Sequence, residues 1–346
     1  MWQQDTTSVV APEAKLSHAA ALWALKSVVI DRLSIARVAD NLGVSWHTAN
    51  AAVLATGRRL LIDDPNRLTG VRVLGVDEHV WRHTRWGNRY VTVVIDLTPV
   101  ADGTGPARLL DMVPGRSKQT FMNWLDAQTS AFRAAVEVVA MDGFTGYKTA
   151  ATEKLPDAIT VMDPFHVVAL AGTASDKCRQ RLQQATLGRR GKTGDPLYGI
   201  RKTLRTGTDY VTEKQRAKLN AAFENPDHDP VQQTWQIYQQ IMAAYRNPNR
   251  AQAKHNLMAV IDSISIGVAA ELVELRTLGR TMKRRADDIL AYFNHARTSN
   301  GPTEAINGRI EHLRGTALGF RNIVHYITRA LLHTGGFRTK LHSFLR

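Results

Sequence analysis

The chain has 346 residues, a length that predicts about two or three structural units. It carries 45 Lys and Arg against 31 Asp and Glu, and this net charge of +14 favours a polyanionic partner. The longest apolar stretches are strand-sized and the N-terminus lacks a charged start before an apolar block, so we expect neither a membrane span nor a signal peptide. One cysteine, Cys178, excludes an internal disulfide and a cysteine-rich zinc module and fits a reducing cytosol.

The N-terminal region is predicted to be helical after a loose tail. Residues 1–15 show no clear period, whereas apolar residues recur at helical spacing in the domain that we predict over 16–70. From Ser34 onward, Gly43 at a turn and Ser45 as a cap give the spacing of a helix-turn-helix. A plain helical hairpin is the alternative. The exposed start of its second helix offers four side chains for DNA: Ser45, Trp46, His47 and Asn50.

A catalytic domain of α/β type is predicted from residue 71 to 166. Five strands are expected within 71–80, 89–97, 108–113, 136–144 and 157–163, with a turn at Trp86-Gly87-Asn88 after the first. Helices are expected after Ser117, around 147–153 and from Pro164. Three hairpin strands followed by alternating helix and strand predict a mixed five-stranded sheet with helices on its faces.

The remainder of the sequence is predicted to be helical in two parts. Residues 167–290 show almost purely helical spacing, and we expect a helical insertion domain there. Residues 291–346 return to compact helices and are predicted to complete the catalytic domain. We interpret Cys178 as an ordinary helix residue of the insertion.

Three acidic residues could form a metal site. Asp77 and Asp142 each close an apolar strand, and Glu304 lies in the first turn of a helix that begins near Pro302. Carboxylate oxygens suit Mg²⁺, and clustered carboxylates would repel one another without cations. The alternatives are a turn residue after each strand and a glutamate that complements the helix dipole.

Neighbouring acids compete with these three for the role. Glu78 should point to the opposite face of its strand, whereas His79 shares the face of Asp77 and could support it or be a surface histidine. Asp163 and His166 could be a supporting pair or could cap and pack a helix. Two further acids, Asp96 and Asp111, are also candidates.

Basic and aromatic residues give weaker signals. Charge runs are usually solvated faces, but these bracket the predicted site in sequence and could hold the DNA backbone. Trp81 and Trp86 could stack on a splayed base, although packing of a hairpin is favoured. The basic candidates are Arg280, Lys283, Arg284, Arg285, Arg309, Arg314 and Arg321.

Four sequence blocks resemble a known family. GVDEH, MDGFTGYKTA, MDPFHVV and ILAYFNHARTSNGPTEAINGRIEHLRGTALGFRN are similar to the ISL-three family of bacterial insertion-sequence transposases, over roughly residues 34–335. The SNGPTEAIN core and the trailing GFRN are the most specific parts. The resemblance implies a ribonuclease H-like catalytic fold and a triad of Asp77, Asp142 and Glu304 that holds Mg²⁺ or Mn²⁺, as two ions. The long interval before Glu304 then agrees with a helical insertion.

The same resemblance implies a function. Such an enzyme binds double-stranded DNA at the terminal inverted repeats of its element, cuts the strands and joins the 3′-hydroxyl to target DNA, acting as a homodimer in a synaptic complex. It would work in the bacterial cytoplasm at the nucleoid. Members commonly begin with a cysteine-rich zinc module, which this sequence lacks. The alternatives are a transposase-derived regulator that binds DNA without catalysis and a structure-selective nuclease of the same fold.

Overall fold

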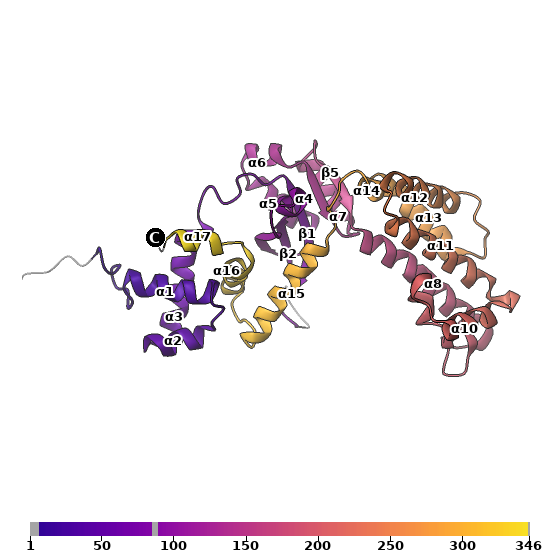
Figure 1. Cartoon of the computed structure of the whole chain (residues 1–346), viewed down its shortest axis with the longest axis horizontal. Coiled ribbons are helices and arrows are strands. Elements are labelled where there is room, and N and C mark those ends of the chain that lie inside the picture. The colour runs from indigo at the N-terminus through magenta and orange to yellow at the C-terminus, as the bar shows by residue number, and fades with distance from the viewer. Residues whose placement is uncertain (1–6, 85–88, 345–346) are drawn as a thin grey trace, which may run out of the picture. The chain divides into compact units, whose positions relative to one another are not determined.

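The structure is a computed structural model that describes residues 7–84 and 89–344. The predicted turn at Trp86-Gly87-Asn88 and the first six residues of the predicted tail lie outside this range. The chain forms two compact units, one of residues 1–158 with 300–346 and the other of residues 159–299 (Figure 1). No helix in the described ranges is long and apolar enough to cross a membrane.

The first unit begins with three short helices. They are α1 (His18–Val29), α2 (Ile35–Leu42) and α3 (Trp46–Gly57), and a π-helical turn over Arg58–Ile62 follows. Ser34 and Ser45 accept backbone N–H groups at the starts of α2 and α3. Gly43 ends α2 in the left-handed conformation, at φ 62°, which costs glycine little. The predicted helices, turn and cap are therefore confirmed.

The central element is a mixed five-stranded sheet, as predicted. Its strands are β1 (Val73–Val80), β2 (Tyr90–Asp96), β3 (Arg108–Pro114), β4 (Val138–Met141) and β5 (Ile159–Met162), in the order β3-β2-β1-β4-β5. The first three are antiparallel neighbours, and β4 runs parallel to β1. All of β4 and the first five residues of β1 are buried, which fits their position inside the sheet.

The two faces of β1 have different surroundings. Leu74 and Val76 belong to a core that includes Phe121 of α5 (Lys118–Asp126) and Tyr147 of α7 (Thr145–Lys154). On the other face, α15 (Gly301–Thr316) lies against β1, and α16 (Ile323–Thr334) contacts β3 and the N-terminal helices. The short helices α4 (Thr98–Asp102), α6 (Ser130–Ala135) and α17 (Arg338–Ser343) complete this unit.

Apart from β5, which falls within residues 159–299, the regular structure of the second unit is helical. Its long helices are α8 (Pro164–Leu187), α10 (Glu213–Phe223), α11 (Asp229–Arg246), α12 (Arg250–Ser265) and α13 (Val273–Arg284). Two short helices, α9 (Pro196–Gly199) and α14 (Ala286–Ala291), lie between and after them, as do 3₁₀ turns at Thr203–Arg205, Thr208–Tyr210 and Pro226–His228. Cys178 is buried in α8, and burial raises the pKa of its thiol to about 11, which suits a packing residue.

Candidate active site

Asp77 and Asp142 lie side by side toward the C-terminal ends of two neighbouring strands. Val76 of β1 pairs with Met141 of β4 in parallel register, so each aspartate directly follows one member of this pair. Asp77 is 9% exposed and Asp142 is half-buried. Burial, and then the negative charges of Asp142, Glu78 and Asp77, raise the pKa of Tyr147. The register of β1 and β4 therefore places the two aspartates side by side at one end of the sheet.

Helix α15 lies directly over this part of β1. A Cβ built on Gly75 would come within 2.8 Å of Thr303 Oγ1, and Asn307 Nδ2 donates to Asp77 Oδ2 at 3.1 Å. From Thr303 to Asn307 the helix advances by about 6 Å, which matches the advance of the strand from Gly75 to Asp77. The helix thus runs alongside β1 in the same direction.

Glu304 is carried by the first turn of the same helix. The helix begins at Gly301 with Asn300 in the capping position and Pro302 in the first turn, as predicted. Glu304 is exposed and lies one turn before Asn307, about 60° from it around the helix axis. Since Asn307 contacts Asp77, the glutamate sits on a helix that is already docked against the strand of the first aspartate.

Backbone groups orient both aspartates. Asp77 Oδ1 accepts the N–H of Glu78 at 2.8 Å, and Asp142 Oδ1 accepts the N–H of Phe144 at 2.8 Å. The second bond forms a tight turn that leads into α7. Asp77 is therefore held at both oxygens, by the backbone N–H of Glu78 and by the side chain of Asn307.

The competing acids have other partners. Asp96 accepts Arg108 Nε at 2.9 Å and is nearly inaccessible. Asp111 accepts Trp124 Nε1 at 2.9 Å, and burial raises the pKa of its carboxyl. Glu78 points away from Asp77 and pairs with a solvent-accessible arginine, Arg116, at 3.1 Å. In the second unit, Asp163 contacts His166 at 3.4 Å, three residues along α8. These contacts indicate a structural role for each of the four acids.

His79 is a packing residue with one strong hydrogen bond. Its Nε2 lies 2.8 Å from the hydroxyl of Tyr326, and both side chains are buried. Burial lowers the pKa of His79 to about 4, so the ring is neutral at pH 7. The surface-histidine alternative is therefore wrong. The contact fixes β1 against α16 two residues beyond Asp77.

The chemistry of the donors suits a hard divalent cation. Carboxylate and carboxamide oxygens are the ligands that Mg²⁺ and Mn²⁺ take. The other amide atom of Asn307, Oδ1, is buried and has no hydrogen-bond partner among the described atoms. This oxygen could therefore accept a hydrogen bond or bind a cation. Within residues 7–84 and 89–344, no three His, Cys, Asp or Glu side chains are grouped so that they could hold a metal ion.

The predicted DNA-contacting residues of α3 separate into two sets. Ser45, Trp46 and His47 are exposed, although the Ser45 hydroxyl also caps the helix. Asn50 is only 6% exposed, so the prediction that it lies on the exposed surface is wrong. Its position is next to Ala49, one turn before Val53, on the side of α3 that packs into the core of the helical region. Helical periodicity turns this asparagine inward.

The basic candidates of the second unit also divide. Arg280, Lys283 and Arg284 are exposed on α13, and Lys283 pairs with Asp262 at 2.8 Å. Arg285 is 4% exposed and its Nε donates to Asp288, so its prediction as a DNA contact is wrong. It ends α13 and begins α14, where the chain turns and buries the guanidinium.

In the first unit, Arg309 and Arg321 are exposed. Arg314 pairs with Glu311 and its side chain is 17% exposed. Trp81 is buried against Tyr326, at 6.3 Å between ring centroids, which confirms packing as its role. Trp86 lies outside the described residues.

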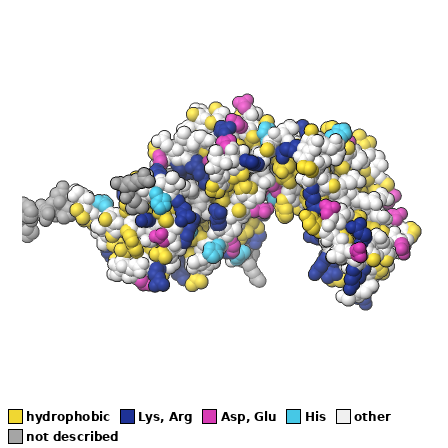
Figure 2. Space-filling model, viewed as in Figure 1, with side chains coloured by type: hydrophobic (Ala, Val, Ile, Leu, Met, Phe, Trp, Pro, Cys, Tyr) yellow, Lys and Arg dark blue, Asp and Glu magenta, His cyan; other side chains and the backbone are white. Residues whose placement is uncertain are grey.

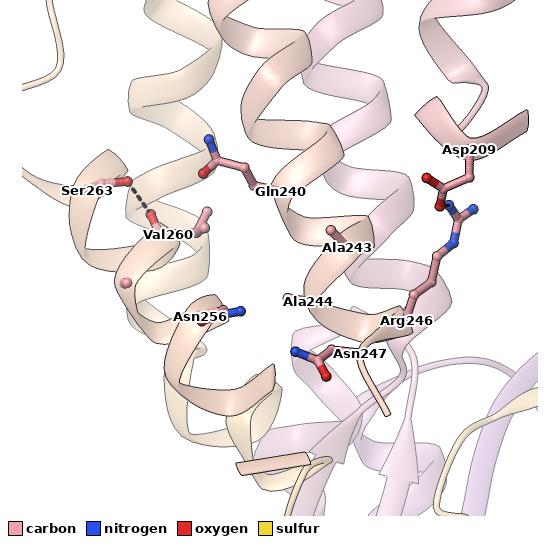
Figure 3. Close-up of a pocket in the computed structure, with 10 residues that line it drawn as sticks. Asp209, Gln240, Ala243, Ala244, Arg246, Asn247, Asn256, Val260 and Ser263 are labelled. Carbon is pink, nitrogen blue, oxygen red and sulfur yellow. Dashed lines mark hydrogen bonds and ion pairs between the residues drawn. The ribbon is translucent and has the colours of Figure 1, made fainter. Parts of the chain in front are cut away.

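A pocket in the second unit lies between α11 and α12 (Figure 3). Its lining includes the amides of Gln240, Asn247 and Asn256, and the ion pair between Arg246 and Asp209 closes one side. Asp209 is the only acidic residue in its lining and it is paired, so this pocket offers no pair of carboxylates like Asp77 and Asp142.

Comparisons with known proteins match this chain to one family model and to transposases of insertion sequences. A family model of the ISL3 (ISL-three) type, described as "Transposase", matches residues 74–330. The transposase for insertion sequence element IS1557 of Mycobacterium tuberculosis is 28% identical over 328 residues, which cover 88% of this chain and 69% of that protein. The transposase for insertion sequence element IS1001 of Bordetella parapertussis is 24% identical over 306 residues, covering 88% of this chain and 70% of that protein. A solved structure, the Drosophila P element transposase strand transfer complex, matches with a TM-score of 0.45 and 12% identity over 90% of each chain.

Proposed function

Because the chain belongs to the ISL3 family of transposases, we propose that it binds the terminal inverted repeats of its element, cleaves the DNA there and joins the ends to target DNA. All four sequence blocks that resemble this family lie within the matched residues. The observation that carries the proposal is the meeting of β1, β4 and α15, which brings two aspartates to one sheet edge and docks the glutamate helix beside them. The sheet order and its antiparallel first three strands support a ribonuclease H-like catalytic domain.

In this proposal Asp77, Asp142 and Glu304 hold Mg²⁺ or Mn²⁺, as a pair of ions. The bound ions would supply an activated nucleophile and stabilise the charge on the leaving oxygen in an in-line displacement. The aspartates start in fixed orientations because backbone N–H groups hold them. Glu304 is exposed, so it is accessible to cations and DNA.

Asn307 is the positioning residue that sequence reasoning missed. Its amide N–H holds Asp77 Oδ2, and the buried carboxamide oxygen faces no donor. Groups that orient a metal-binding carboxylate usually matter nearly as much as the carboxylate itself. The signal was present in the sequence as a helix neighbour three positions after Glu304, on the same side of α15.

DNA binding is proposed for exposed residues at three places. In the helix-turn-helix formed by α2 and α3, Ser45, Trp46 and His47 would contact the inverted repeat. The basic residues available to the DNA backbone are Arg309, Arg321, Arg280, Lys283 and Arg284, with Arg314 in a supporting ion pair. We further propose a DNA-binding domain over residues 16–70, a catalytic domain formed by 71–166 and 291–346, and an insertion domain over 167–290. We also propose a homodimer in the synaptic complex and action at the bacterial nucleoid.

The test is cleavage of a duplex that carries the element's terminal inverted repeat, with Mg²⁺ present. We expect Asp77→Asn and Glu304→Gln to abolish cleavage while binding to the same duplex is retained, because each removes a ligand charge and little volume. Full cleavage by either variant would refute the assignment. Binding by the wild-type protein without any Mg²⁺-dependent nicking would support the regulator. Cleavage of branched DNA regardless of sequence, with no joined product, would support the nuclease.

A further inference from the structure

Four arginine side chains and one neutral histidine form a cluster on the first unit. We call it the arginine cluster; it consists of Arg32, Arg309, Arg329, Arg338 and His333. Arg32 follows α1, Arg309 lies on α15, Arg329 and His333 lie on α16, and Arg338 begins α17. Lys and Arg side chains are visible over the region of α16 and α17 in Figure 2. A residue near the N-terminus therefore joins three consecutive C-terminal helices in bringing like charges together.

The contacts inside the arginine cluster centre on His333. Arg32 Nη1 donates to the carbonyl of His333 at 2.8 Å and lies 3.1 Å from its Nδ1. Arg329 Nη2 lies 3.3 Å from Nε2 of the same ring. Burial, followed by the charges of Arg338 and Arg309, lowers the pKa of Arg32, so these guanidinium groups repel one another.

Arg329 is the unusual member because it is buried without a counter-charge. It is 6% exposed, its Nε has no hydrogen-bond partner, and burial lowers its pKa to about 10, which leaves it charged at pH 7. The other two buried arginines, Arg179 and Arg285, pair with Asp176 and Asp288. Among the described residues, none of the four arginines of the cluster has a salt bridge to a carboxylate. Such an arrangement is costly unless an anion completes it.

The hydrogen bonds of His333 leave a donor in excess. Burial, then the charges of Arg329, Arg32 and His312, lower the pKa of His333 to about 3, so the ring is neutral. A neutral imidazole accepts at one nitrogen only, whereas arginine groups approach both nitrogens. One guanidinium N–H therefore points at a nitrogen that carries its own proton.

We propose that the arginine cluster is a binding site for a backbone phosphate of duplex DNA. The exposed guanidinium groups of Arg32, Arg309 and Arg338 match phosphate oxygens, and the negative charge of a phosphate beside them would offset the buried charge of Arg329. This inference rests on the proposed function. It fits the chain's net charge of +14 and the fact that α15 carries both Glu304 and Arg309. A phosphodiester held here would tie the DNA to the helix that bears the proposed catalytic glutamate.

The experiment measures binding of a generic 30-base-pair duplex by fluorescence anisotropy, without divalent metal, at several salt concentrations. Losing one phosphate contact should reduce the slope of log K against log salt by about 0.9. We expect this change for Arg32→Gln and Arg329→Met. The matched control is Arg72→Gln, which removes an arginine that is paired with Asp102 and Glu137 in the same unit. Slopes equal to wild type in both cluster variants would overturn the proposal.

Two further measurements distinguish a DNA phosphate from free phosphate, and a loss of binding from a loss of folding. In thermal unfolding without DNA, Arg329→Met should be as stable as wild type or more so, because it removes a buried unpaired charge. A large loss of stability would mean that the fold itself compensates Arg329, and it would overturn the proposal. Stabilisation by inorganic phosphate with unchanged DNA slopes would identify a small-anion site instead and also overturn it. Asp77→Asn should keep the wild-type slope, so failed catalysis and a failed phosphate site are distinguishable.

Discussion

Two proposed binding clusters on the first unit are built differently. In the proposed acidic cluster of Asp77, Asp142 and Glu304, the two aspartates are fixed by backbone hydrogen bonds at the ends of paired strands. The arginine cluster has no such frame, and its most buried member, Arg329, lacks a partner at Nε. The aspartates of the proposed cation site are therefore ordered in advance, whereas the proposed phosphate site gathers charge for a ligand whose position varies along a polymer.

Helix α15 connects the two clusters. Its first turn carries Glu304, its second carries Asn307 against Asp77, and Arg309 follows two residues later. A displacement of this helix should therefore disturb catalysis and leave the charge of the arginine cluster unchanged. The comparison can be tested by changing the contact between α15 and β1, then the hydrogen bond on Asp77, and finally the ring at the centre of the arginine cluster.

The largest effect is expected from Gly75→Val. A Cβ at this position would meet Thr303 Oγ1 at 2.8 Å and Leu97 Cδ1 at 3.0 Å, so the Thr303 and Leu97 side chains or α15 itself must shift, and the two further carbons of valine add to this crowding. Displacement of a reacting group by about 1 Å can cost roughly 100-fold in rate, and overpacking costs about 1–3 kcal/mol of stability. The measurements are the rate of cleavage and the free energy of unfolding.

The matched control for this change is Gly308→Val on the same helix. Gly308 is exposed, and an added Cβ there meets nothing within 4 Å. This variant should cleave at the wild-type rate. If Gly75→Val also cleaves normally at wild-type stability, the close packing of α15 on β1 is not required for the active site.

The next largest effect is expected from Asn307→Ala. It removes the N–H that holds Asp77 Oδ2, and loss of such an orienting group typically costs about 10- to 100-fold in metal affinity or activity. Mn²⁺ binding by calorimetry gives a readout that does not depend on cleavage. A purely structural role would lower the melting temperature and leave the Mn²⁺ affinity of the folded protein unchanged.

A second substitution, Asn307→Asp, separates the hydrogen bond from the oxygen ligand. It keeps an oxygen beside Asp77 but replaces the donor with a like charge, so the protein without metal should be less stable than wild type. Added Mn²⁺ should recover more stability in this variant than in Asn307→Ala. Equal recovery in the two variants would contradict a cation near Asn307.

The contrast between the clusters also shows what the sequence can reveal. Asp77 and Asp142 follow short apolar runs, and such runs predict strands whose ends meet at one sheet edge. Glu304 follows a proline and a motif with strong family resemblance. The strands, their mixed sheet and the start of α15 were therefore predictable, because each depends on local pattern.

The remaining features depend on contacts between distant residues. Asn50 and Arg285 were expected on the surface, but the packing of α3 and the turn between α13 and α14 bury them. Arg32 and Arg329 both contact His333, although about 300 residues separate them in the sequence, and neither lies in a run of charged residues. Helical spacing places a side chain on a face, but it does not say which face another segment will cover.

The smallest effect is a change in how stability depends on pH at the arginine cluster. The ordinary pKa of histidine is 6.5, and that of His333 is lowered to about 3 in the folded protein. Between these values the unfolded chain binds one more proton than the folded chain, so stability is complete above pH 6.5 and falls as the pH decreases toward 3. The contribution is up to about 1.4 kcal/mol for each pH unit.

His333→Gln keeps a polar side chain but cannot titrate, so its unfolding free energy should fall less steeply between pH 6.5 and 5, measured with a chemical denaturant. Above pH 7.5 the two proteins should run parallel, which serves as the internal control. The groups that oppose protonation are Arg329 on α16, Arg32 after α1 and His312 on α15. A bound phosphate would offset these charges and ease protonation, so a short duplex should reduce the wild-type slope toward that of the variant. If DNA leaves the wild-type slope unchanged, His333 does not sense a phosphate, and the arginine cluster lacks the ligand that we assign to it.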